Sequence, residues 1–73
     1  MASNEKPYTR VVRALRHLRG MSQRDLARAS GVTVRTIRSI EAEGTDPRAC
    51  TLLQVLNALD ATPADRAQAL ASR

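Results

Sequence analysis

The chain has 73 residues and a formal net charge of +5, with one cysteine and one histidine. At this length it is one domain with a small core, which leaves little room for a deep catalytic pocket. Cys50 alone excludes an internal disulfide, and with His17 it cannot supply the ligand set of a structural zinc site. No apolar run approaches the ~20 residues of a membrane span or the roughly 7–15 of a signal peptide. We therefore expect a soluble cytoplasmic protein that starts near Met1, has no membrane segment and needs no metal or other cofactor.

The positive charge is concentrated in the first part of the chain. Residues 1–40 hold nine of the twelve basic side chains but two of the seven acids. This placement predicts a polyanion partner on one side of the fold. A coding bias toward arginine is the alternative explanation, but it would not account for where the arginines lie. Because Tyr8 is the only aromatic residue, stacking on single-stranded bases is disfavoured and duplex DNA is favoured.

The first two helices follow a short tail. Residues 1–7 are polar and are predicted to be flexible. Residues 8–19 are predicted to be helical, because apolar side chains recur there at helical spacing before Gly20. These apolar residues are Tyr8, Val11, Val12, Leu15 and Leu18. Ser22 and Asp25 have the spacing of a capping box, so a second helix is expected over about 23–30, before Gly31.

Three more helices complete the predicted fold. The third runs from Val34 to about residue 43 behind the N-cap Thr33, and its inner side carries Ile37, Ile40 and Glu41. A turn at 44–47 precedes a fourth helix, whose apolar stripe is Leu52, Val55, Leu56 and Leu59. Thr62 caps a fifth helix over about 63–71. No strand pattern occurs, so the fold class is all-α, and the short link between the second and third helices predicts a helix-turn-helix.

The outward face of the third helix carries the candidate DNA-reading residues. They fall within an arc of about 140° opposite Ile37 and Ile40, and are Val34, Arg35, Arg38 and Ser39, together with Ala42. Arginine forks onto guanine or reaches phosphate, serine bonds to bases, and valine meets a thymine methyl group. The N-terminal ends of the second and third helices suit phosphate, with Gln23, Thr33 and Thr36 as added contacts. A solvated charged face is the alternative interpretation of this arc.

The segment SQRDLARASGVTVRTIRSIE, residues 22–41, resembles the helix-turn-helix of lambda-repressor and Cro-like (XRE-type) DNA-binding domains. The similarity extends over residues 11–60. It is carried by Gln23, by the Leu26–Ala27 pair, by the Gly31–Val32 turn, and by Ile37 and Ile40. The resemblance implies a compact five-helix domain over residues 8–73, whose third helix is a recognition helix for the major groove.

The resemblance also implies roles for single residues. Val34, Arg35 and Ser39 would read bases, and Arg38 is an added candidate. Arg16 would pair with Glu41 and lock the first helix to the recognition helix, and it is a further candidate for a phosphate contact. The loop after the recognition helix would place Thr45 and Arg48 on phosphate. Glu43 stands where the family often has glycine, and with Asp46 it weakens these loop contacts.

Two classes of function remain open. The first is a sequence-specific regulator that binds double-stranded DNA, with a weak homodimer that is either pre-formed or assembled on DNA. Its interface would come from the end of the fourth helix and the fifth helix. The second is an antitoxin-like or adaptor module that binds a protein partner, for which the feature to seek is an exposed apolar patch such as Ala49, Leu53 and Leu70. An enzyme is not expected, because no nucleophile set, carboxylate pair or glycine-rich phosphate loop occurs.

Overall fold

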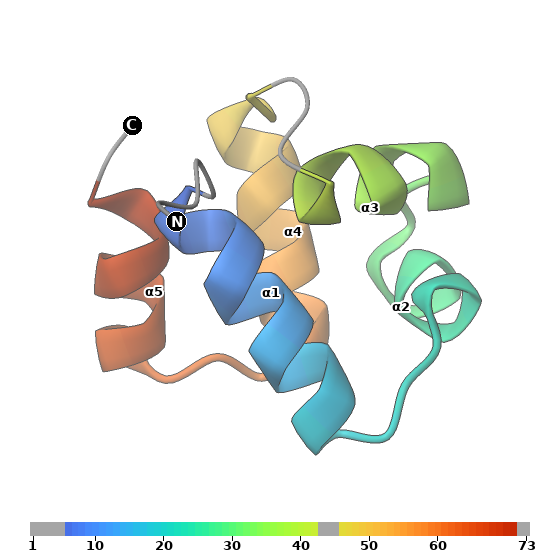
Figure 1. Cartoon of the computed structure of the whole chain (residues 1–73), viewed down its shortest axis with the longest axis horizontal. Helices are drawn as coiled ribbons and strands as arrows, with labels where there is room; N and C mark the ends of the chain where they lie inside the picture. The colour runs from blue at the N-terminus through green and yellow to red at the C-terminus, as the bar shows by residue number, and fades with distance from the viewer. Residues whose placement is uncertain (1–5, 43–45, 72–73) are drawn as a thin grey trace, which may run out of the picture.

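In a computed structural model, the described residues are 6–42 and 46–71. They form the helices α1 (Pro7–Leu18), α2 (Gln23–Ser30), α3 (Val34–Glu41), α4 (Ala49–Ala58) and α5 (Pro63–Leu70), without a strand. Figure 1 shows α1 at the front between α5 and α3, with α4 behind it and α2 next to α3. The all-α class and the helix-turn-helix of α2 and α3 are confirmed. None of these helices is long and apolar enough to cross a membrane.

One core fills the space between the helices. Its largest fully buried apolar side chains are Val12, Leu26, Ile37, Ile40, Leu52, Val55, Leu56 and Leu59. The stripe predicted for the fourth helix is therefore confirmed. Leu18, the last residue of the apolar spacing in α1, is instead 73% exposed. Next to it, Arg19 reaches the end of α4, where its Nε and Nη2 donate to the carbonyls of Leu59 and Asp60 at 3.0 and 3.2 Å.

Local capping explains why α2 begins and ends where the sequence predicts. Ser22 Oγ accepts from the Asp25 backbone N–H at 3.0 Å, and the Asp25 carboxylate accepts from the Ser22 N–H at 2.9 Å. This N–H donation holds the pKa of Asp25 below its ordinary value. At the other end, Gly31 has a φ of 76°, a left-handed conformation that glycine adopts without strain.

Other helix boundaries differ from the sequence prediction, and the ends of α1 and α5 do so by one residue each. α1 begins at Pro7, one residue earlier than predicted, since proline is well tolerated in the first turn of a helix. α3 ends at Glu41 rather than near residue 43. The carbonyls of Ile40 and Glu41 accept hydrogen bonds from side chains of α1, so the helix end is satisfied by a neighbour and not by further turns. Residues 43–45 lie outside the described residues.

Candidate nucleic-acid interface

The C-terminal end of α3 is held by a charged contact with α1. Arg16 Nε donates to Glu41 Oε2 at 2.7 Å, and Arg16 Nη2 donates to Glu41 Oε1 at 2.9 Å. Gln23, at the start of α2, adds a bond from its Nε2 to Glu41 Oε1 at 3.3 Å. Glu41 is 8% exposed, and a carboxylate this buried is costly without such partners. The ion pair therefore joins α1, α2 and α3 at one point.

Two further side chains of α1 bind the same end of α3. Thr9 Oγ1 donates to the Ile40 carbonyl at 2.7 Å, and Arg13 Nη1 donates to the Glu41 carbonyl at 3.3 Å. The last carbonyls of a helix carry partial negative charge, so these donors stabilise that end. Sequence analysis missed both contacts. The available signal was the spacing of Thr9 and Arg13 with Arg16, which places all three on one face of α1.

The guanidinium of Arg16 is fully engaged inside the fold. Its hydrogen bonds with Glu41 raise its pKa above the ordinary value, with the opposite charge adding to the effect and burial opposing it. A third nitrogen, Nη1, donates to the carbonyl of Met21 at 2.9 Å. Because the side chain is only 12% exposed, we exclude Arg16 from the phosphate contacts proposed below.

The outward side of α3 carries the exposed arginines Arg35 and Arg38. Within the described part of the chain, neither side chain takes part in a hydrogen bond or an ion pair. Ser39 is half-buried, and Val34 packs partly against the core, so only part of the valine side chain faces outward. The two arginines are thus the most accessible of the four base-reading candidates.

The N-terminal end of α3 is capped from within. Thr33 Oγ1 accepts from the Thr36 backbone N–H at 3.2 Å, and its hydroxyl donates to Thr36 Oγ1 at 3.0 Å. Thr33 is exposed and Thr36 is half-buried, which leaves both hydroxyls near the surface. Gln23, the third polar candidate, turns its amide toward Glu41 instead. Thr45 lies outside the described residues.

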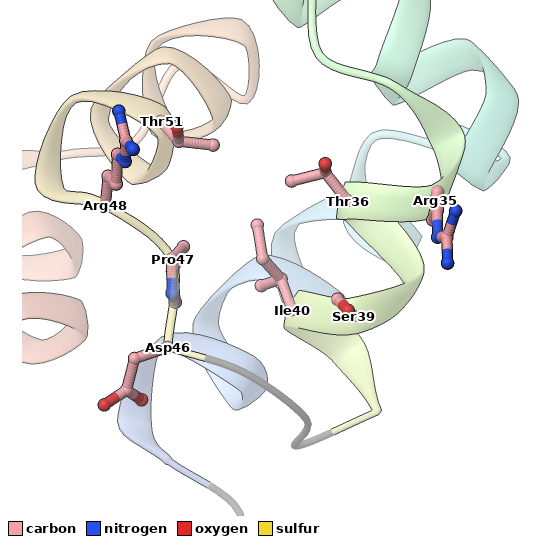
Figure 2. A pocket seen from close by; sticks show the side chains of 8 residues that line it. All are labelled: Arg35, Thr36, Ser39, Ile40, Asp46, Pro47, Arg48 and Thr51. Carbon is pink, nitrogen blue, oxygen red and sulfur yellow. The ribbon is translucent and has the colours of Figure 1, made fainter.

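A groove of about 310 Å³ separates α3 from the start of α4. Figure 2 shows its walls, with Thr36 and Ile40 on one side and Arg48 and Thr51 on the other. The remaining lining residues are Arg35, Ser39, Asp46 and Pro47. The groove brings the sequence candidates Arg35, Thr36, Ser39 and Arg48 together, and it adds Thr51, which sequence analysis did not single out. The side chain of Arg48, the N-cap residue of α4, forms no capping hydrogen bond to the first backbone N–H groups of this helix.

One comparison with known proteins agrees with this geometry. The sequence profile described as Helix-turn-helix matches residues 12–66, which run from α1 into α5. No curated protein and no solved structure matches the chain at a significant level. In the described ranges, no group of three or more acidic, histidine or cysteine side chains could hold a metal ion.

Proposed function

Because the chain belongs to the XRE-type, lambda-repressor-like family of helix-turn-helix DNA-binding domains, we propose that it is a sequence-specific transcriptional regulator. It binds double-stranded DNA with α3 in the major groove. One observation carries this proposal. The C-terminal end of α3 is fixed by Arg16 and Thr9, while Arg35 and Arg38 on the outward side have no partner among the described residues.

The proposed contacts to bases come from α3. Arg35 and Arg38 fork onto guanine O6 and N7, the most frequent specific contact in the major groove. Ser39 adds a hydrogen bond, and the exposed part of Val34 meets a thymine methyl group. Because Arg35 also lines the groove beside α4, it lies between the base-reading face and the proposed path of the DNA backbone.

The proposed contacts to phosphate surround α3. Arg48 and Thr36 lie on opposite walls of the groove, where a phosphate accepts hydrogen bonds from both. Thr33 and the start of α3 offer a second contact, and the backbone N–H of Gln23 at the start of α2 offers a third. Thr45, in the segment after α3, is retained as a further candidate.

A weak homodimer that assembles on DNA accompanies this function. An eight-residue recognition helix reads few base pairs, and two copies one helical turn apart read twice as many. Two chains of charge +5 repel each other, yet α4 contains no charged residue and exposes Ala49, Cys50, Leu53, Gln54 and Asn57. This face and the small exposed residues of α5 are the proposed interface. Its limited area favours assembly on DNA over a stable free dimer.

The same surface supports the alternative function, an antitoxin-like or adaptor module. Leu53 is 38% exposed and Ala49 is exposed next to it, as expected of a docking site for a protein. Leu70, the third residue of the expected patch, is half-buried, which makes the patch smaller. The variant Leu53→Glu separates the two functions. If the protein is a regulator, this variant loses cooperative binding to paired half-sites but still binds a single half-site.

The test of the proposed function begins with selection of duplexes from a random-sequence library, followed by fluorescence anisotropy. We expect the selected duplex to bind about 10³-fold more tightly than a scrambled one at physiological salt. Arg35→Ala then removes most of this preference, while Arg24→Ala, an exposed arginine of α2, leaves it intact. A library that yields no preferred sequence would contradict the regulator and favour the protein-binding alternative.

A further inference from the structure

The described residues that line the groove between α3 and α4 include an acid beside the arginines. Arg35 and Arg48 line it together with three hydroxyl-bearing residues, and among the described lining residues Asp46 is the only carboxylate. An exposed carboxylate that shares a groove with arginines attracts them, and an arginine paired in this way is less available to phosphate. Asp46 is therefore a potential inhibitor of the proposed DNA contact.

Asp46 is nevertheless held away from these arginines. The hydroxyl of Tyr8, in the first turn of α1, donates to Asp46 Oδ1 at 2.6 Å. Figure 2 shows the carboxylate at the opposite end of the groove from Arg48 and pointing away from α3. Among the described residues, Asp46 forms no ion pair with Arg35 or Arg48.

Tyr8 is well suited to hold Asp46 in this position. Its side chain is 2% exposed, so the ring is fixed in the core and the hydroxyl has little freedom to move. A short hydrogen bond to a carboxylate is also among the stronger ones in proteins. The bond joins residues 38 positions apart, from the start of α1 to the segment that leads into α4.

We propose that Tyr8 is a positioning residue of the DNA interface: it holds Asp46 at the α1 end of the groove and so leaves Arg35 and Arg48 available for DNA. This inference rests on the proposed function, since it concerns the same groove. Without the Tyr8 hydroxyl, the carboxylate turns into the groove and pairs with an arginine. The protein then loses one cationic contact to DNA, although all of its arginines are still present.

The experiment is a double-mutant cycle on the full chain. It uses fluorescence anisotropy with a labelled mixed-sequence duplex of about 20 base pairs, two helical turns, over a range of salt. We expect Tyr8→Phe to bind about fivefold more weakly and to lower the slope of log K against log salt by about 0.9, the value for one phosphate contact. Asp46→Asn, which keeps an oxygen acceptor for Tyr8 but removes the charge, binds as tightly as the wild type or more so.

The decisive variant is the combination of Tyr8→Phe with Asp46→Asn. It is expected to bind like Asp46→Asn alone, because a neutral side chain in the groove no longer competes for arginine. Tyr8→Phe with Asp60→Asn is the matched control. It also removes one negative charge, but from the turn before α5 and outside the groove, so it is not expected to restore binding to DNA. Asparagine also tolerates the positive φ of 55° at position 60.

Two outcomes would overturn the inference. In the first, Tyr8→Phe binds DNA like the wild type. In the second, the weaker DNA binding of Tyr8→Phe persists when it is combined with Asp46→Asn, which would mean that Tyr8 acts only through packing. Circular dichroism and thermal melts check that each variant is folded. A wild type that binds no duplex contradicts the proposed function instead, so the two failures are distinguishable.

Discussion

The arginines of α1 and those of α3 have the same side chain but opposite surroundings. Arg13 and Arg16 of α1 and the adjacent Arg19 donate hydrogen bonds to carbonyls or to Glu41, and so join helices. Arg35 and Arg38 of α3 point outward without a hydrogen bond or ion pair to any described residue. The excess of arginine in residues 1–40 therefore has two separate roles. In one group, Arg13 and Arg16 hold the end of α3 and Arg19 holds the end of α4, whereas the other group, on α3, is available to DNA.

The largest expected effect comes from breaking the first group at Arg16. Arg16→Met removes the cation that faces Glu41 and leaves a largely buried carboxylate with Gln23 alone. We expect the free energy of unfolding to fall by about 2–4 kcal/mol, and the melting temperature by roughly 10–20 °C. Thermal melts followed by circular dichroism measure this, with the exposed Arg24→Met as the control. A loss no larger than that of Arg24→Met would show that the pair does not fix α3.

The second effect separates binding from stability. Arg35→Ala is expected to weaken binding to a selected duplex by about 1–3 kcal/mol, roughly 5- to 150-fold. Its melting temperature stays close to that of the wild type, because the side chain is exposed and makes no contact within the described fold. Anisotropy titrations and melts on the same samples check both values. If Arg35→Ala left DNA binding unchanged but lowered the melting temperature, Arg35 would act like the arginines of α1, which would contradict the comparison between α1 and α3.

A smaller effect is expected at Thr9. Thr9→Val keeps the shape of the side chain but leaves the Ile40 carbonyl without its donor, which costs about 1–2 kcal/mol. Thr9→Ser retains the hydroxyl and is expected to lose less. Urea unfolding midpoints measure the difference. Equal losses in the two variants would mean that the Thr9 methyl group, and not its hydrogen bond, stabilises the end of α3.

The smallest effect concerns pH and the start of α2. The pKa of Asp25 is lowered in the folded state by the Ser22 N–H, so folding stabilises the ionised form. This contribution is fully present above the ordinary carboxyl pKa and is lost as the pH falls through the lower folded value. We expect the wild type to lose slightly more stability than Asp25→Asn between pH 5 and about pH 3. Thermal melts over this pH range measure the loss, and an equal loss of stability in the two proteins would contradict this prediction.

Features encoded in local sequence were predictable. The capping pair Ser22 and Asp25 and the glycine Gly31 set the bounds of α2, and the apolar spacing from Leu52 to Leu59 marked the buried side of α4. The pairing of Arg16 with Glu41 came from the family resemblance, not from spacing, since the two residues lie 25 positions apart.

Features that depend on tertiary packing could not be predicted. Thr9 meets Ile40 across 31 positions, and Tyr8 meets Asp46 across 38. Spacing places Thr9 on the same face of α1 as Arg16, but no local pattern identifies the partner of either residue. The Thr9 contact, together with that of Arg13 to the Glu41 carbonyl, also explains the early end of α3, because donors from α1 satisfy carbonyls that a longer helix would have bonded. The role of Thr51 in the groove likewise follows only from the position of α4 against α3.

The central claim is that the arginines of α3 read DNA while those at α1 join the helices of the fold. Two double variants that each remove two positive charges test it most directly: Arg35→Ala with Arg38→Ala, and Arg13→Ala with Arg19→Ala. The measured quantity is the ratio of affinities for a selected and a scrambled duplex, at a temperature where both variants are folded. We predict that the α3 variant loses the preference by about 100-fold or more, whereas the α1 variant keeps it within about threefold, because its base contacts remain. Equal loss of the preference in both variants would contradict the account.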